Sequence, residues 1–144
     1  MKKIVFCLVI SALWACGEDR SGVEKLEKEV FAIHDEVMPQ SGKLLELQEQ
    51  VSQDIATTDS LFKLKATPAL EKRKTDGLAL SEALKDADSA MMDWMHDYKA
   101  DSLKTLKVAD AMPYLEAEKV KINTVRDKML QSMNQAQKFL GSNP

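Results

Sequence analysis

Two pairs of side chains in this sequence combine residue types and spacing that could bind a ligand. His34 and Met38 are four residues apart, and so are Met92 and His96. Residues four apart share one face of a helix, so each pair would present an imidazole and a thioether side by side. Thioether sulfur favours Cu(I), and imidazole also suits copper. If their helices meet, these four residues form a candidate soft-metal site.

The same residues also fit an ordinary helical core, and the sequence favours that interpretation. Methionine fills irregular gaps between helices, and Met91 and Trp94 fall on the apolar seam of their segment. In heptad terms Met92 and His96 point outward while His34 lies at the flank, so the two pairs converge poorly. We therefore expect no resident cofactor, with Cu(I) held by the His and Met residues as the alternative.

A partner-binding patch is another role open to the methionines. Trp94 is flanked by Met92 and Met95, and a chain folded back twice would bring Met112 near the same end. Exposed aromatic and methionine side chains are typical of contact sites between proteins. The sequence therefore predicts an apolar surface patch of Met92, Trp94, Met95 and Met112, with an envelope protein of unknown identity as its partner.

Catalytic schemes find little support in these residues. The chain has two histidines, and it contains no Gly-rich phosphate loop and no Ser-centred nucleophile elbow. Asp35 and Glu36 are adjacent, so they would face different directions on a helix. Asp93 and His96 match the acidic-x-x-His element of di-iron bundles, but that chemistry needs two such elements and further carboxylates. We therefore expect a protein that is not an enzyme.

The N-terminus carries the pattern of an export signal. Lys2 and Lys3 precede a largely apolar run over residues 4–15, and charged residues follow at once. This run is too short to span a bilayer, which needs roughly 20 apolar residues. The sequence Leu13-Trp14-Ala15-Cys16 resembles the lipidation box of bacterial lipoproteins, although Trp14 is bulkier than usual at its position. An ordinary secretory signal with a chance cysteine is the alternative.

The resemblance to a lipidation box implies a membrane address. It implies a diacylglyceryl thioether on Cys16, an acylated amino group such as a palmitate amide, and loss of residues 1–15. Two or more acyl chains anchor a protein stably, whereas one binds only marginally. Glu18 and Asp19 resemble an export tag that sends lipoproteins to the outer face of the outer membrane, and the alternative is a merely solvated linker. We expect an outer-membrane protein in either the periplasmic or the surface-facing leaflet.

The expected domains are a signal peptide over residues 1–15, a lipidated tether over 16–22 and a helical domain over 23–141. Without its two leading lysines the chain has 18 basic and 23 acidic residues, whereas binding of nucleic acid asks for a basic surface. Cys7 would leave with the signal and Cys16 would carry lipid, so no disulfide is available. Packing alone must then stabilise the domain.

Apolar residues recur at alternating steps of three and four in three segments, which predicts helices. In the first segment these residues are Leu26, Val30, Ile33, Val37, Leu44, Leu47 and Val51. Pro39 interrupts the first segment, but the seam keeps its phase across it, so we expect a continuous helix kinked there. Thr67 and Pro68 indicate the start of a second helix that runs to about Tyr98.

The third predicted helix begins with Asp110 as its cap, carries Pro113 in its first turn and ends before Gly141. Residues 57–67 and 99–109 are expected to connect the three helices. The sequence therefore predicts an all-α fold, an antiparallel and coiled-coil-like bundle of three helices. Such folding places His34 level with residues 87–96, at the end of the bundle beside the lipid anchor.

Two short motifs carry a family resemblance. AIHDEVMP at residues 32–39 and MMDWM at residues 91–95, behind a lipidation box, are similar to a family of short bacterial lipoproteins. Members often carry the label viral A-type inclusion protein, which reflects coiled-coil similarity. The resemblance implies no activity, substrate or site. The expected function is therefore a membrane-anchored, non-catalytic module for protein interaction or envelope structure, and the alternative is a periplasmic copper-binding protein.

Overall fold

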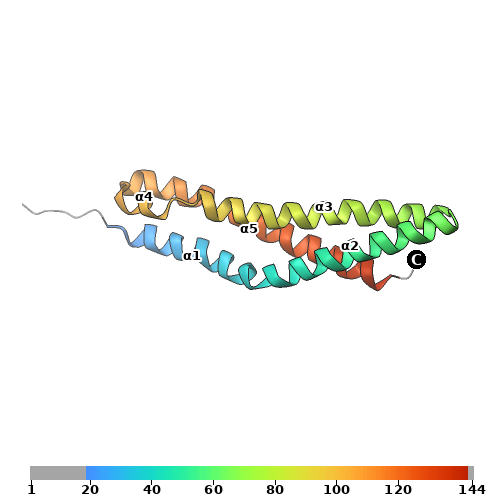
Figure 1. The fold of residues 1–144 in the computed structure, drawn as a ribbon. Coiled ribbons are helices and arrows are strands. Elements are labelled where there is room, and N and C mark those ends of the chain that lie inside the picture. Colours follow the sequence, from blue (N-terminus) through green and yellow to red (C-terminus); the bar gives the residue numbers. More distant parts are fainter. Residues whose placement is uncertain (1–18, 143–144) are drawn as a thin grey trace, which may run out of the picture.

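The computed structural model describes residues 19–142, whose regular elements are all helices (Figure 1). They are α1 (Ser21–Val37), the 3-10 turn η1 (Met38–Gln40), α2 (Ser41–Leu64), α3 (Pro68–Asp97), α4 (Ala100–Thr105) and α5 (Val108–Gly141). The predicted all-α class is confirmed, and three long helical segments pack against one another. No helix in this described part is long and apolar enough to cross a membrane. The predicted signal peptide and Cys16 lie outside it.

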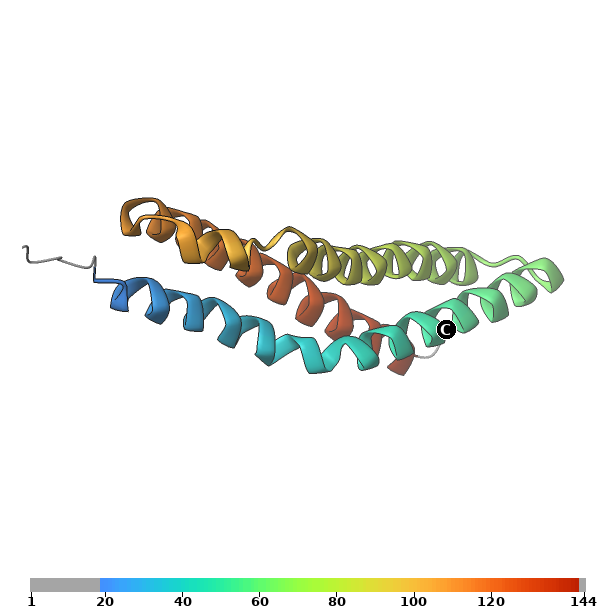
Figure 2. The ribbon, with the colours of Figure 1, turned by 60° about the vertical axis from the view of Figure 1, so that its left-hand side comes forward.

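The turn η1 separates α1 from α2 at Pro39. Figure 2 shows the chain changing direction there. Proline has no N–H to donate, so the regular ladder of helical hydrogen bonds cannot continue through it. Val37 and Leu44 lie on either side of the turn, seven residues apart, and both are fully buried. The apolar face of the first segment therefore continues through the turn.

The core consists of the apolar seams of the three long segments. Its members include Leu26, Val30, Val37, Leu44, Leu47 and Val51 from the first segment, Leu80, Leu84, Ala87, Met91 and Trp94 from α3, and Leu115, Ile122, Val125, Met129 and Ala136 from α5. Burial of each large aliphatic side chain contributes about 2 kcal/mol before conformational entropy is counted. Figures 1 and 2 show α3 running back along α2, and α5 running back along α3 in the same direction as α1, on which it also packs.

Several helix boundaries differ from those expected. The helix α2 continues to Leu64 through a stretch expected to be a loop, because the hydroxyls of Thr57 and Ser60 donate to the carbonyls four residues before them, each at 2.9 Å. The helix α5 begins at Val108, so Asp110 lies in its first turn and Pro113 lies inside it. The predicted start of α3 agrees, since the Thr67 hydroxyl accepts from a backbone N–H of the first turn.

Gly77 lies in the middle of α3, where α2 and α5 both approach closely. A Cβ at this position would lie 2.8 Å from Cγ1 of Ile55 and 3.2 Å from Cζ of Phe139. Glycine normally weakens a helix interior. The structure shows that the missing side chain instead allows three helices to meet.

Replacing Gly77 with alanine is expected to destabilise the bundle. Overpacking costs about 2 kcal/mol, which exceeds the gain of about 1 kcal/mol from better helix propensity. Urea titration followed by far-UV circular dichroism measures the difference. In an Ile55→Ala background, which empties the space that the new methyl needs, Gly77→Ala should be neutral or stabilising. An equal loss in both backgrounds would show that the clash with Ile55 is not the cause.

The end of the bundle where α1 begins is closed by one arginine. The guanidinium of Arg20 donates to the carbonyls of Leu106, at 2.5 Å, and Leu103, at 2.9 Å. These carbonyls lie at the C-terminal end of α4, where the last carbonyls of a helix have no backbone N–H of the same helix to accept from. Figure 1 shows α4 and the start of α1 at the same end, opposite the turn between α2 and α3.

Candidate functional site

A row of aromatic rings connects α1, α3 and α5 in the half of the bundle nearest the N-terminus. The Trp94 ring lies 5.6 Å from the His34 ring and 5.2 Å from the Tyr98 ring, measured between centroids. Phe31 meets Tyr98 edge to face at 5.1 Å, and Tyr114 lies 6.0 Å from Tyr98. These distances fall within the range in which aromatic pairs attract one another.

The rings lie where the first segment separates from α3. Before η1, the helix α1 packs mainly along α5. After η1, the helix α2 packs mainly along α3 (Figure 2). The change of direction at η1 thus opens the space between α1 and α3, and only long side chains reach across it. Trp94 from α3 and Phe31 and His34 from α1 do so. The aromatic row is therefore a packing consequence of the turn at Pro39.

Two polar atoms in this row are buried without a hydrogen-bond partner among the described residues. They are Nε1 of Trp94 and the hydroxyl of Tyr98. Burial raises the pKa of Tyr98 well above its usual value, and the negative charges of Glu27 and Glu118 raise it further. The hydroxyl of Tyr114 differs, because it accepts a hydrogen bond from the backbone N–H of Lys99 at 2.8 Å.

Removing these two hydroxyls should have different effects on stability. The Tyr98 hydroxyl is buried near the Glu27 carboxylate without forming a hydrogen bond of good geometry, so Tyr98→Phe should leave the free energy of unfolding equal or raise it by less than about 1 kcal/mol. Tyr114→Phe removes a bond and leaves the Lys99 N–H unpaired, which should cost about 1 kcal/mol. Thermal unfolding of both variants measures the contrast. Equal losses in the two would mean that Tyr98 has a partner.

The four candidate metal ligands have other neighbours. Nδ1 of His34 lies 2.9 Å from a carboxylate oxygen of Asp35, and the sulfur of Met38 accepts from the Ser41 hydroxyl at 3.7 Å. Met92 and His96 are exposed on α3. Within residues 19–142 no group of three or more His, Cys, Asp or Glu side chains is placed to hold a metal ion. The copper site stays a prediction.

The four residues of the predicted partner patch differ in burial, and one of them lies apart from the other three. Trp94 is buried, Met95 is half-buried, and Met92 has 56% of its surface exposed. Met112 lies elsewhere, because its sulfur is 3.9 Å from the position of a Cβ on Gly22, at the start of α1. Since α1 rises about 1.5 Å per residue, Met112 lies some 24 Å along the bundle from η1.

The structure shows a different apolar surface beside Met92. Phe31, Met38 and Leu45 follow one another at intervals of seven along the first segment, and Phe31 and Leu45 are 37% and 52% exposed. Leu45 is the apolar residue of a shallow hollow between α2 and α3, which is otherwise lined by the polar residues Gln48, Glu49, Ser52, Ser81 and Lys85. Met92 is seven residues after Lys85 and therefore continues the same side of α3. We call Phe31, Met38, Leu45, Met92 and Met95 the apolar strip.

A pattern in the sequence indicates the part of the apolar strip that lies on the first segment. A second row of apolar residues at intervals of seven accompanies the main seam, one position after Val30, Val37 and Leu44. Such a second row widens the apolar face of a helix beyond what a narrow coiled-coil seam needs. Pattern alone left undecided whether this row is covered, and in the structure it lies half open.

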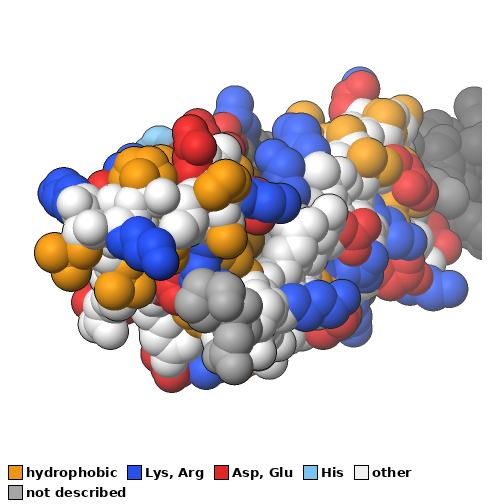
Figure 3. All heavy atoms as spheres, turned by 90° about the vertical axis from the view of Figure 1, so that its right-hand side faces the viewer, with side chains coloured by type: hydrophobic (Ala, Val, Ile, Leu, Met, Phe, Trp, Pro, Cys, Tyr) orange, Lys and Arg blue, Asp and Glu red, His pale blue; other side chains and the backbone are white. Residues whose placement is uncertain are grey.

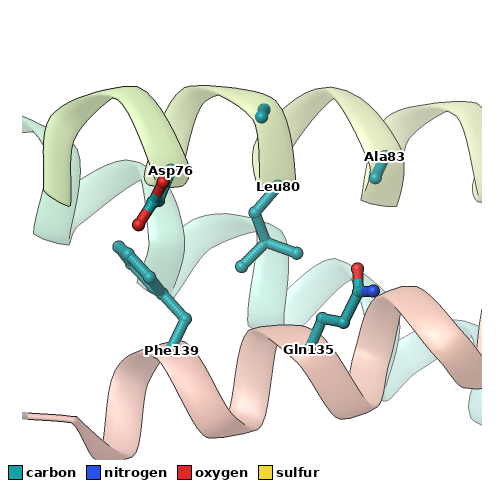
Figure 4. A pocket seen from close by; sticks show the side chains of 6 residues that line it. Asp76, Leu80, Ala83, Gln135 and Phe139 are labelled. Carbon is teal, nitrogen blue, oxygen red and sulfur yellow. The ribbon is translucent and has the colours of Figure 1, made fainter. Parts of the chain in front are cut away.

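A shallow cavity of about 300 Å³ lies between α3 and α5, lined by Asp76, Ala79, Leu80, Ala83, Gln135 and Phe139 (Figure 4). Its single ionisable side chain, Asp76, is paired with Lys72 at 2.7 Å. The lining thus provides one carboxylate and one amide beside apolar groups. We searched the chain against protein-family profiles, curated proteins and solved structures, and none of the three comparisons found a match.

Proposed function

We propose that the protein is a bacterial lipoprotein, anchored through Cys16, whose helical domain is a non-catalytic module that docks other envelope proteins. In this proposal the three segments form an antiparallel, coiled-coil-like bundle, and the first helix is continuous and kinked at Pro39. The register supports that interpretation: His34 lies level with Trp94, and Ile55 lies level with Gly77. When the first segment and α3 run antiparallel, residue numbers rise along one as they fall along the other, so the two numbers in each facing pair should add up to nearly the same sum. These two pairs do so.

The anchor rests on the lipidation box and on its position. The helix α1 begins at Ser21, only five residues after Cys16. A lipid on Cys16 would therefore hold the α1 and α4 end of the bundle close to the membrane surface. The long axis of the bundle could then carry its opposite end about 60 Å away, given 1.5 Å of rise per residue. The outer membrane is the proposed location, in either leaflet.

The apolar strip is the observation that carries the docking proposal. It runs over 14 residues of the first segment, which is about 21 Å of helix. That length suits one amphipathic helix of a partner, laid into the shallow seam with its apolar side inward. The half-exposed Met92 and Met95 provide adaptable contacts, because methionine side chains are flexible and polarisable.

Photocrosslinking in intact cells tests the docking proposal. A photoreactive residue replaces Met92, and the matched control replaces Val120, an exposed apolar residue on α5. We expect a discrete adduct with one envelope protein from position 92 and none from position 120. The adduct should disappear when Leu45→Glu is added, because a carboxylate in the strip repels an apolar partner. Equal adducts from both positions, or an adduct that survives Leu45→Glu, would contradict the proposal.

Copper binding is the second candidate function. It is favoured by the placement of Met38 and Met92 on the same strip, with His34 one helical turn from Met38. Competition against a Cu(I) chelator at micromolar concentration tests it with the full chain. The candidate requires one bound ion and at least tenfold weaker binding in a His34→Ala, His96→Ala double variant. No uptake at micromolar copper ends this candidate.

A further inference from the structure

The turn between α2 and α3 projects beyond the end of α5. Nη1 of Arg73 donates at 2.8 Å to the carbonyl of Ser142, which directly follows α5. The turns of α2 and α3 on the far side of that contact therefore form a two-helix hairpin without a third helix over it. Figure 1 shows this hairpin as the end of the molecule opposite α4. We call residues 61–74 the hairpin tip.

The hairpin tip is basic in a chain that is otherwise acidic. Counted together with Asp59 and Asp76, the acidic partners of its lysines, it contains five basic and three acidic residues, whereas the rest of the chain contains 15 basic and 20 acidic residues. The basic residues are Lys63, Lys65, Lys72, Arg73 and Lys74. A cluster of one charge sign at one end of a long molecule attracts surfaces of the opposite sign. The chemistry that fits the tip is therefore anionic.

Apolar side chains protrude among these lysines. Leu64, the last residue of α2, is 84% exposed, and Leu61 is 44% exposed. Figure 3 views the molecule from this end and shows hydrophobic side chains interspersed with lysine and arginine. Transfer of an exposed leucine side chain from water to an apolar medium lowers its free energy, so this arrangement favours contact with such a medium.

The lysines are free to leave their present partners. Lys63 pairs with Asp59 and Lys72 with Asp76, both at 2.7 Å, and both lysine side chains are about three-quarters exposed. Lys74 also meets Asp59. Pairs this exposed contribute little stability, so an anionic surface can compete for the ammonium groups. Arg73 is different, because it is nearly buried against Asp54 and stays with the fold.

We propose that the hairpin tip binds the surface of an anionic lipid bilayer. Leu61 and Leu64 enter the headgroup region, while Lys63, Lys65 and Lys72 meet lipid phosphates. A bilayer suits the tip better than an acidic protein does, because the tip is a protruding end whose exposed leucines stand among its lysines. If Cys16 anchors the opposite end as proposed above, the protein spans the gap between its own membrane and a second anionic surface.

Vesicle clustering with the full-length chain tests this inference. The protein is reconstituted into neutral phosphatidylcholine vesicles, and vesicles containing phosphatidylglycerol are added as the second surface. Co-flotation of the protein with the first vesicles measures anchoring alone. Clustering of the two kinds of vesicle, followed by light scattering, measures binding of the tip to the second surface. We expect clustering with the anionic vesicles only, and we expect it to fall as salt rises. The two readouts separate failure of the anchor from failure of the tip.

Matched variants locate the contact. Each lysine removed near an anionic surface should weaken binding roughly fivefold, so Lys63→Gln, Lys65→Gln and Lys72→Gln together should raise the lipid concentration needed for clustering about a hundredfold. Leu61→Ser with Leu64→Ser should also abolish clustering. Circular dichroism confirms that each variant remains helical.

The control replaces exposed residues away from the tip, namely Val120→Ser, Leu130→Ser, Lys25→Gln, Lys104→Gln and Lys128→Gln. It should cluster vesicles as the unmodified chain does. The inference is overturned if neutral second vesicles cluster equally well, or if tip and control variants behave alike. It is also overturned if an acidic polypeptide binds the tip while anionic vesicles do not.

Discussion

Trp94→Ala is expected to lower the free energy of unfolding by about 4 kcal/mol, which is a large part of the stability of a domain of this size. Trp94 is almost fully buried, and its ring contacts Phe31 and His34 of α1 as well as Tyr98 at the end of its own helix. The indole fills the space between α3 and α1, so we expect that the cavity left by alanine cannot close without moving α1. Urea titration followed by far-UV circular dichroism measures the loss without relying on the fluorescence of the residue removed.

Trp94→Phe is the matched control for that prediction. It keeps most of the ring surface and removes Nε1, a buried donor without a partner among the described residues. Relief of that unpaired donor should offset part of the lost contact area, so the expected loss is about 1 kcal/mol. Similar losses in Trp94→Phe and Trp94→Ala would contradict the view that the ring bridges the two helices.

Arg73→Ala is expected to cost about 2 kcal/mol, the second largest effect. The guanidinium of Arg73 bonds both carboxylate oxygens of Asp54, at 3.0 and 2.6 Å, and stacks 4.5 Å above the centroid of Phe139. The side chains of Arg73 and Asp54 are only 10% and 21% exposed. Removing Arg73 therefore leaves a largely buried carboxylate with the Thr58 hydroxyl, at 3.3 Å, as its remaining donor, and it also frees the end of α5.

Two variants separate the geometry of this contact from its charge. Arg73→Lys keeps the positive charge but loses the paired hydrogen bonds and the stacked plane, so it should recover only about half of the loss. Lys72→Ala removes the neighbouring lysine, whose pair with Asp76 is exposed, and should change stability by less than about 0.5 kcal/mol. Equal effects of Arg73→Ala and Lys72→Ala would contradict a specific role for Arg73.

Heptad pattern predicted the helices and most of the core. Of the seven seam residues expected in the first segment, six are buried and Ile33 is half-buried. The persistence of phase from Val37 to Leu44 correctly indicated that one apolar face continues past Pro39. Pattern succeeds here because burial along a helix depends on spacing, which the sequence states directly.

Contacts between helices were harder to predict. The aromatic row depends on the distance between α1 and α3 on the N-terminal side of η1, and no residue pattern gives that distance. The same holds for Met112, which lies beside Gly22 because of the register between α1 and α5. The role of Gly77 could not be predicted either, since a close approach of three helices leaves no trace in local propensity.

The loop boundaries failed for a local reason. Threonine and serine between Thr57 and Ser60 suggested a connection, because their hydroxyls often compete with the helical backbone. In the structure these hydroxyls bond to preceding carbonyls of the same helix, and α2 continues to Leu64. The extra helical turns are what carry the hairpin tip beyond α5.

The intact mass of the protein purified from the membrane fraction of bacterial cells tests the proposed lipid anchor most directly. The proposal predicts a chain that begins at Cys16, carries the added mass of a diacylglyceryl group and one amide-linked acyl chain, and floats with membranes. Cys16→Ser should leave the protein unacylated and outside the membrane fraction. A mature chain with a free thiol at residue 16, or one cleaved at another residue and found in the soluble fraction, would contradict the proposal.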